Sequence, residues 1–128
     1  MKIGVIGAGN VGGALGRLFA AKGHDVMYSA RDPQAMSDKT RKALAATGDQ
    51  AQVGSVAETV AFGEVIVLAV GYDAVADALT HGGSWQGKII IDAVNYFGTP
   101  KAGSVAQEIA QQAAGAKVVK AFNTLGER

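Results

Sequence analysis

The stretch that decides the fold is Lys2-Ile3-Gly4-Val5-Ile6-Gly7-Ala8-Gly9-Asn10-Val11-Gly12-Gly13-Ala14-Leu15-Gly16. Its first residues are mostly apolar and predict a short strand that is buried on both faces. The glycines that follow, Gly7, Gly9 and Gly12, stand at the spacing G-x-G-x-x-G. This spacing predicts a tight turn that leads from the strand directly into a helix.

Each of the three glycines has its own task in the predicted turn. Gly7 allows the tight turn, Gly9 lets a pyrophosphate approach the backbone without meeting a Cβ, and Gly12 lets the helix lie close to the strand. The first N–H groups of the helix and the positive end of its dipole then form an anion site without a basic side chain. The turn therefore predicts a dinucleotide site, with a purely structural turn as the alternative.

The surroundings of the motif favour the dinucleotide interpretation. One copy of so short a motif could arise by chance in a chain with 18 glycines. Here it follows a predicted strand and opens a helix with apolar residues at helical spacing, namely Val11, Leu15, Leu18 and Phe19. A second strand is predicted at residues 25–30, so the motif lies within a strand, helix, strand unit.

Length and composition limit the class of protein. The chain of 128 residues is predicted to form one domain, residues 1–128, with a single core. A net charge of +1 from scattered charged residues argues against a nucleic-acid partner. The lack of cysteine excludes disulfides and thiolate metal sites. No stretch has the pattern of a signal peptide or of a membrane span, so a cytoplasmic protein without a membrane partner is expected.

The end of the second predicted strand indicates which dinucleotide binds. NAD-preferring folds usually place Asp or Glu there, to accept hydrogen bonds from the ribose hydroxyls. This chain has Ser29-Ala30-Arg31 instead, and the Arg31 guanidinium suits the 2′-phosphate of NADP. A solvated surface arginine is the alternative. A helix is predicted over residues 33–46, with Asp32 as its N-cap and Pro33 as its first residue.

The rest of the chain continues the alternation of strands and helices. Further strands are predicted at residues 52–53, 65–70, 88–95 and 116–122, and helices are expected after the capping residues Ser55, Asp73 and Ser104. Six strands with right-handed crossovers imply an α/β protein with a doubly wound parallel sheet in the order 3-2-1-4-5-6, the three-layer Rossmann fold. Tyr72 and Asn95 follow strands at the edge where such sheets bind ligands, and for Tyr72 simple packing is an equal alternative.

Three separated stretches resemble one family. They are residues 3–16 with the glycine motif, Ile91-Asp92-Ala93-Val94-Asn95, and Val118-Val119-Lys120-Ala121-Phe122-Asn123-Thr124. Together they resemble the NADP-binding domain of the NADPH-dependent oxidoreductases of the deazaflavin coenzyme F-420. The resemblance covers essentially the whole chain, and its last two stretches are more specific than the glycine motif.

The resemblance implies roles for individual residues. The backbone N–H groups of Asn10 and Val11 would contact the pyrophosphate, and Arg31 would hold the 2′-phosphate. The residues implied to line the path toward the nicotinamide are Ala69, Val70, Asn95, Ala121 and Asn123.

The chain departs from the family pattern in two respects. Family members commonly carry a small hydroxyl residue directly before the arginine, where this chain has Ala30. Ser29, one place earlier, is counted among the predicted cofactor-binding residues, although its side chain is expected to face the other way in a strand. Members also continue past Asn-Thr into a largely helical portion that helps form the deazaflavin site and the dimer, and that portion is absent from this chain. The uncovered strand at residues 116–124 predicts a homo-oligomer.

The implied activity is hydride transfer between NADPH and a deazaflavin or related small-molecule acceptor. The cofactors carry this chemistry, and the protein supplies orientation and excludes water. We therefore assign no catalytic side chain and no metal ligand. Two other functions stay open: a non-catalytic module that binds or senses NADP, and a reductase of flavin or metal acceptors.

Overall fold

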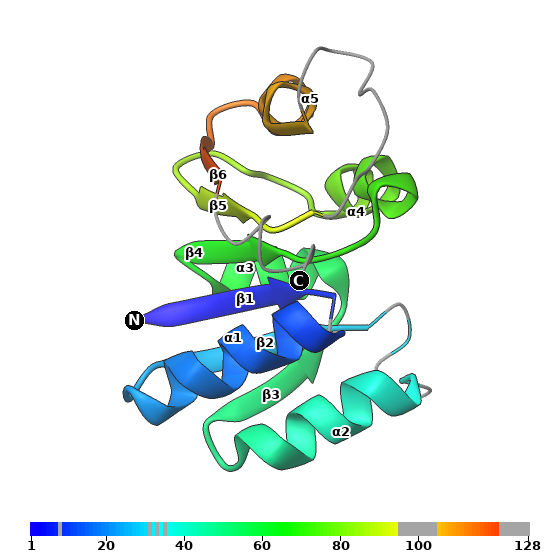
Figure 1. Ribbon diagram of the computed structural model, residues 1–128. Helices are drawn as coiled ribbons and strands as arrows, with labels where there is room; N and C mark the ends of the chain where they lie inside the picture. The colour runs from blue at the N-terminus through cyan, green and yellow to red at the C-terminus, as the bar shows by residue number, and fades with distance from the viewer. Residues whose placement is uncertain (8, 31, 33, 35, 95–104, 121–128) are drawn as a thin grey trace.

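The computed structural model describes residues 1–7, 9–30, 32, 34, 36–94 and 105–120, and the side chains of residues 10, 72, 105 and 106 lie outside this description. Strands and helices alternate along the chain (Figure 1). The strands are β1 (Lys2–Ile6), β2 (Asp25–Ser29), β3 (Ala51–Gly54), β4 (Val65–Leu68), β5 (Ile89–Asp92) and β6 (Lys117–Lys120). The helices are α1 (Asn10–Ala21), α2 (Asp38–Thr47), α3 (Val56–Phe62), α4 (Val75–His81) and α5 (Val105–Gln112), with a short 3-10 turn η2 (Tyr72–Ala74) before α4.

The six strands form one parallel sheet in the order β3-β2-β1-β4-β5-β6. Ile3 of β1 pairs with Val26 of β2 on one side and with Val65 of β4 on the other. Buried side chains of α1 and α2 pack in the core on one face of the sheet, and those of α3, α4 and α5 pack in the core on the other. Figure 1 shows the two groups of helices on opposite sides of the sheet. This arrangement confirms the predicted Rossmann fold and its strand order.

Successive side chains of the central strands enter two different cores. In β1, Ile3 and Val5 belong to the core beneath α1 and α2, whereas Ile6 belongs to the core beneath the other three helices. Residues 66–68 of β4 alternate in the same way and are all fully buried. The uninterrupted apolar run of β4 thus follows from the cover on both faces of the sheet.

Helix α1 packs on the sheet through a glycine as well as through part of the predicted apolar stripe. A Cβ at Gly16 would overlap the hydroxyl of Tyr28, which is fully buried beneath the helix. Leu18 was expected on the buried face, but its exposed fraction is 51%. Two residues along a helix span about 200°, so Leu18 lies opposite Gly16 and points away from the sheet.

Helix α2 starts later than predicted. Its N-cap is Ser37, whose Oγ accepts a hydrogen bond from the backbone N–H of Thr40 at 3.3 Å. Asp32 does not cap this helix, because its Oδ1 accepts instead from the backbone N–H of Gln34, within a local turn, at 3.0 Å. Both residues are good capping residues, and the chain uses the second of them for α2.

Of the other predicted helix and strand boundaries, the structure confirms some and corrects others. The capping box of α3 is confirmed, with Ser55 Oγ accepting from Glu58 N–H at 3.1 Å and Glu58 Oε1 accepting from Ser55 N–H at 2.9 Å. Asp73 does not cap α4, because it lies in η2 and the N-cap position is Ala74, which makes no side-chain cap. β4 ends at Leu68, two residues before the predicted end. Pro33 and Ser104 lie outside the described residues.

Within the described part of the chain, no helix combines the length and the apolar character that crossing a membrane requires.

Candidate functional site

The candidate site lies at the carboxyl edge of the sheet, between β1 and β4. These two strands are neighbours, but the chain leaves β1 toward the face of α1 and leaves β4 toward the face of α4 (Figure 1). Such a divergence is the switch point at which open α/β sheets bind ligands. The glycine motif after β1 lies directly at this point.

Gly7 and Gly12 are enclosed by the protein. Gly7 has a φ of 99°, and a Cβ there would overlap the backbone carbonyl oxygen of Ala69. A Cβ at Gly12 would overlap the carbonyl oxygen of Gly7. Both positions therefore require glycine for the turn to close against β4 and α1.

Gly9, between them, faces open space. Its φ is −75°, which any residue adopts, and no protein atom lies within 4 Å of the position that a Cβ would take. Gly9 is the N-cap of α1 and gives it no side-chain hydrogen bond, and the first turn carries no acidic residue. The first N–H groups of α1 thus face an open space. Neither a capping side chain nor a carboxylate from the first turn of α1 accepts a hydrogen bond from them.

A groove of about 480 Å³ runs from this turn across the end of β2. We use the name groove for this cavity throughout. Its lining comes from β1, β2, α2, α3, α4 and their connections, and consists of Ile6, Gly7, Gly9, Ser29, Ala30, Asp32, Met36, Ser37, Lys39, Thr40, Val56, Val70, Ala74, Asp77 and Ala78. Among these described residues Lys39 is the one cation, and Asp32 and Asp77 are the carboxylates.

The structure brings part of the predicted site together. The groove is lined by Gly7, Gly9, Ser29 and Val70. Ala69 packs against Gly7 behind the turn, and its backbone N–H donates to the carbonyl oxygen of Ile6 at 2.8 Å. The backbones of Asn10 and Val11 form the first turn of α1 with that of Gly12. The other predicted residues, Arg31, Asn95, Ala121 and Asn123, lie outside the described residues.

Several groove residues were not expected from the sequence. Lys39 and Ser37 belong to the first turn of α2 and its cap, and Asp77 and Ala78 belong to α4. The sequence carries no motif for them, because their place in the groove depends on where α2 begins and on how α4 packs. Tyr72 was predicted either to line the groove or to pack in the core, and its side chain lies outside the described ones.

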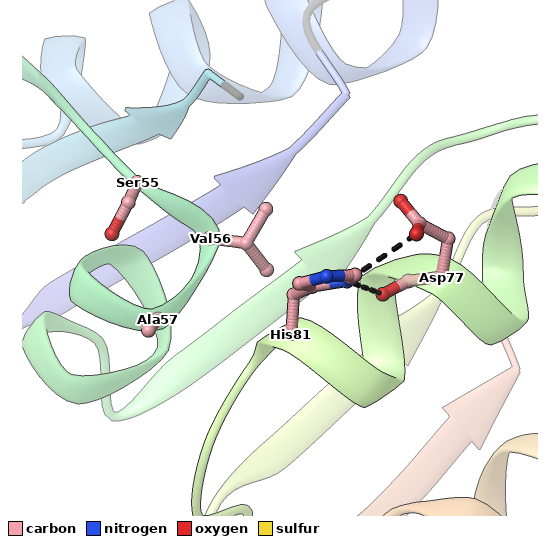
Figure 2. Close-up of a pocket in the computed structure, with 5 residues that line it drawn as sticks. All are labelled: Ser55, Val56, Ala57, Asp77 and His81. Carbon is pink, nitrogen blue, oxygen red and sulfur yellow. Dashed lines mark hydrogen bonds and ion pairs between the residues drawn. The ribbon is translucent and has the colours of Figure 1, made fainter. Parts of the chain in front are cut away.

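A second cavity, of about 430 Å³, lies between α3 and α4 and is lined by Ser55, Val56, Ala57, Asp77 and His81 (Figure 2). His81 Nδ1 lies 3.3 Å from Oδ1 of Asp77 and 2.8 Å from its carbonyl oxygen. The Ser55 hydroxyl points away from this pair in Figure 2 and is engaged in the cap of α3. These three residues therefore do not form a nucleophile activated by histidine.

Two buried side chains near this edge of the sheet have altered acidity. Burial raises the pKa of Asp92, at the end of β5, although its Oδ1 accepts a hydrogen bond from Val94 N–H at 3.0 Å. The other oxygen, Oδ2, has no hydrogen-bond partner among the residues that the structure describes. Burial likewise raises the pKa of Tyr28, whose hydroxyl lies 2.7 Å from Oγ1 of Thr47. In the described ranges, no group of three His, Asp or Glu residues is placed to hold a metal ion.

Comparison with known proteins identifies the family. The model of the family described as coenzyme F-420-dependent NADP oxidoreductase matches residues 2–96. A protein of Arthrobacter sp. FB24, provisionally assigned as an F-420-dependent NADP reductase, is similar in structure with a TM-score of 0.83 and 30% identity, over 97% of this chain and 63% of that one. A hypothetical protein of Sinorhizobium meliloti has a TM-score of 0.76 and 30% identity, over 96% of this chain and 62% of that one.

More distant structures share the fold. A reductive aminase of Aspergillus terreus, solved in complex with NADPH, has a TM-score of 0.67 at 23% identity, over 93% of this chain and 38% of that one. This chain thus spans less than two thirds of the length of these relatives. The family model covers most of the chain, including the glycine turn and the strands around the groove. The chain belongs to the family of coenzyme F-420-dependent NADP oxidoreductases.

Proposed function

We propose that the chain binds NADP(H) in the groove and serves a reductase that transfers a hydride between NADPH and coenzyme F-420 or a related acceptor. The observation that carries the proposal is the contrast within the glycine motif. Gly7 and Gly12 are enclosed by protein atoms, whereas Gly9 faces the open groove at the start of α1. A side chain is absent at the one motif position where the protein itself leaves room for it, as a phosphate lying close to the backbone requires.

The glycine turn would hold the pyrophosphate. The backbone N–H groups of Asn10 and Val11, in the first turn of α1, would donate hydrogen bonds to it. At the other end of the groove, Ser29 and Arg31 would contact the adenosine ribose and its 2′-phosphate, Ser29 as a groove residue and Arg31 on the sequence argument alone.

Ala69 and Val70 would form the start of the path toward the nicotinamide, with Asn95, Ala121 and Asn123 assigned to it by the family resemblance. Bound NADPH supplies the hydride. The residues of the chain hold and orient the nucleotide, and apolar groups such as Val70 and Ala74 limit the access of water to it. We assign no catalytic role to a side chain.

Nucleotide titration tests the binding part of the proposal. Gly9→Val should place methyl groups where the pyrophosphate lies and reduce NADPH affinity at least about 100-fold, a loss of roughly 3 kcal/mol. The fold should survive, because the new side chain enters open space. Ala14→Val, at an exposed position of the same helix, is the matched control and should bind normally. Unchanged affinity in Gly9→Val would refute the site.

Hydride transfer tests the acceptor. Oxidation of NADPH in the presence of F-420, followed by absorbance, should be faster than with a flavin at equal concentration. Faster transfer to flavin would favour the flavin-reductase alternative. Nucleotide binding without transfer to F-420, flavin or ferric chelates would favour a binding or sensing module.

The cytoplasmic location and the homo-oligomer stay predictions from the sequence.

A further inference from the structure

We propose that Asp92, the last residue of β5, is a positioning residue for the nucleotide in the groove. As a neutral carboxyl it holds the chain that leaves β5 against the end of β4, and as a carboxylate it releases that chain. This inference rests on the proposed function and adds a pH-dependent element to it. Asp92 does not itself line the groove, so it acts through a residue that does.

The carboxyl of Asp92 lies in an apolar part of the core. The residue is fully buried, and Ile90, on the same face of β5, belongs to the core beneath α3, α4 and α5. Leu68, its partner in β4, belongs to the same core. Oδ1 accepts a hydrogen bond from Val94 N–H at 3.0 Å, and Oδ2 has no partner within the described ranges. A buried carboxylate with one bare oxygen is costly, whereas a neutral carboxyl is tolerated.

The charged groups on the neighbouring elements do not offset this cost. Lys120 of β6 is the partner of Asp92 in the sheet register, but within the described part of the chain no ion pair joins the two. The charged side chains of α5 and α4 are the buried Glu108, and Asp77 and His81, which pair with each other. Burial raises the pKa of Asp92 more than its backbone hydrogen bond and the Lys120 ammonium lower it. The carboxyl thus stays neutral to a higher pH than an exposed aspartate does.

Backbone hydrogen bonds connect Asp92 to the wall of the groove. The next residue, Ala93, donates its N–H to the carbonyl oxygen of Leu68, at the end of β4, at 3.0 Å. Two residues beyond Leu68 the same chain reaches Val70, which lines the groove where the path toward the nicotinamide is proposed to begin. A shift of the chain that leaves β5 is therefore passed to the groove through the end of β4.

Ionisation favours a different position of the Asp92 side chain. As a carboxylic acid it carries a proton on Oδ2 and keeps Oδ1 as the acceptor for Val94 N–H. As a carboxylate it is stabilised by turning toward water and toward the Lys120 ammonium, on an exposed residue of β6. That turn breaks the hydrogen bond to Val94 and loosens the chain after β5. The groove wall is thus held below the folded-state pKa of Asp92 and loosened above it.

The pH dependence of NADPH binding tests the assignment. Dissociation constants are measured from about pH 5 to about pH 9 for the wild type and for Asp92→Asn, whose amide oxygen still accepts from Val94 N–H but cannot ionise. The two should agree at low pH, and the wild type should bind about fivefold more weakly at high pH, the loss expected of one hydrogen bond. Titration of the NADPH phosphate is common to both proteins and cancels in the ratio of their constants.

Two lysine variants in β6 sharpen the test. Lys120→Ala should move the fall in affinity to higher pH, because it removes a charge that favours the carboxylate. Lys117→Ala, at the other end of the same strand, is the matched control and should leave the midpoint of the fall unchanged. Both positions are exposed, so these variants keep the test decisive if Asp92→Asn does not fold.

Carbon NMR of the Asp92 carboxyl, assigned by its loss in Asp92→Asn, separates this role from a merely structural one. Its midpoint should coincide with the fall in affinity, and exchange of the Val94 amide should speed up above it. A wild-type profile equal to that of Asp92→Asn, two different midpoints, or an equal shift in Lys117→Ala would each overturn the assignment. A wild type that binds no NADPH at any pH would instead refute the proposed function, so the two failures are distinguishable.

Discussion

The glycine turn and the α2 side of the groove are built in different ways. At the turn the backbone makes the site, because Gly7 and Gly12 pack against main-chain oxygens and Gly9 faces the open groove. On the α2 side, side chains line the groove, with Ser29 from β2 and Lys39 from α2. The first region can be recognised in the six consecutive residues from Gly7 to Gly12. The second exists only when two elements come together.

This difference predicts how the two regions respond to substitution. A change in the turn should affect folding or binding according to what surrounds each glycine. A change on the α2 side should affect the choice between nucleotides and leave folding nearly unchanged, since exposed side chains there make few internal contacts.

The largest effect is expected within the glycine turn. Gly12→Ala should lower the free energy of unfolding by at least about 3 kcal/mol, because the new methyl group overlaps the Gly7 carbonyl oxygen and backbone cannot move aside easily. Gly9→Ala should lower it by no more than about 1 kcal/mol, because the methyl group enters open space and the cost is only that of alanine in place of glycine at an N-cap. Urea denaturation of both variants measures this contrast. Equal losses in the two variants would contradict the contrast between Gly9 and Gly12.

A smaller effect is expected at Arg31, which lies outside the described residues and which the sequence alone assigns to the 2′-phosphate. Arg31→Ala should weaken NADPH binding by roughly 1.5–3 kcal/mol, about one to two orders of magnitude in Kd, and leave NADH nearly unchanged. The reason is the loss of a charge-assisted contact to the 2′-phosphate. Titration with both nucleotides, repeated at higher salt, measures it. A wild-type preference for NADH would contradict the predicted cofactor, and equal losses would make Arg31 a general electrostatic residue.

Asp92 extends the comparison to a buried side chain at the end of β5. Burial raises the pKa of Asp92 in the folded state above its value in the unfolded state. The protonated carboxyl therefore contributes most to the stability of the fold below the unfolded-state pKa, which is near 4. This contribution is lost as the pH rises through the folded-state pKa. Asp92→Asn should therefore lose less stability than the wild type between pH 4 and pH 7. Denaturation at both pH values measures the difference, with Asp49→Asn at an exposed position as the control. An identical pH dependence in wild type and Asp92→Asn would contradict the assignment.

The weakest effect is expected at the edge of the sheet. In the described residues β6 pairs with β5 alone, and Val119 is 50% exposed. Unpaired strand edges favour association, so we expect the chain to dimerise at high concentration. Val119→Lys should shift sedimentation toward the monomer. The effect is expected to be weak, because the charged residues Lys117 and Lys120 in the same strand oppose such pairing. A wild type that remains monomeric over a wide range of concentrations would exclude this edge as an interface.

The sequence by itself determined the parallel sheet, its strand order and the glycine turn. Strand and helix periodicities and capping residues such as Ser55 are local signals, and handedness leaves few ways to join six such units. The family and the predicted nucleotide also follow from short motifs, since the turn that is proposed to hold the pyrophosphate is built from consecutive residues. This much was predictable because the physics involved acts over a few residues.

Only the tertiary structure decided which of two good caps begins α2 and which side of α1 meets the sheet. Asp32 and Ser37 have similar capping ability, but Asp32 accepts a hydrogen bond within a local turn and Ser37 caps α2. Leu18 looks buried by period but is exposed, because the glycine face of α1 lies on Tyr28 instead. For the same reason Lys39 could not be foreseen in the groove: its place depends on contacts between elements distant in sequence, which no local pattern records.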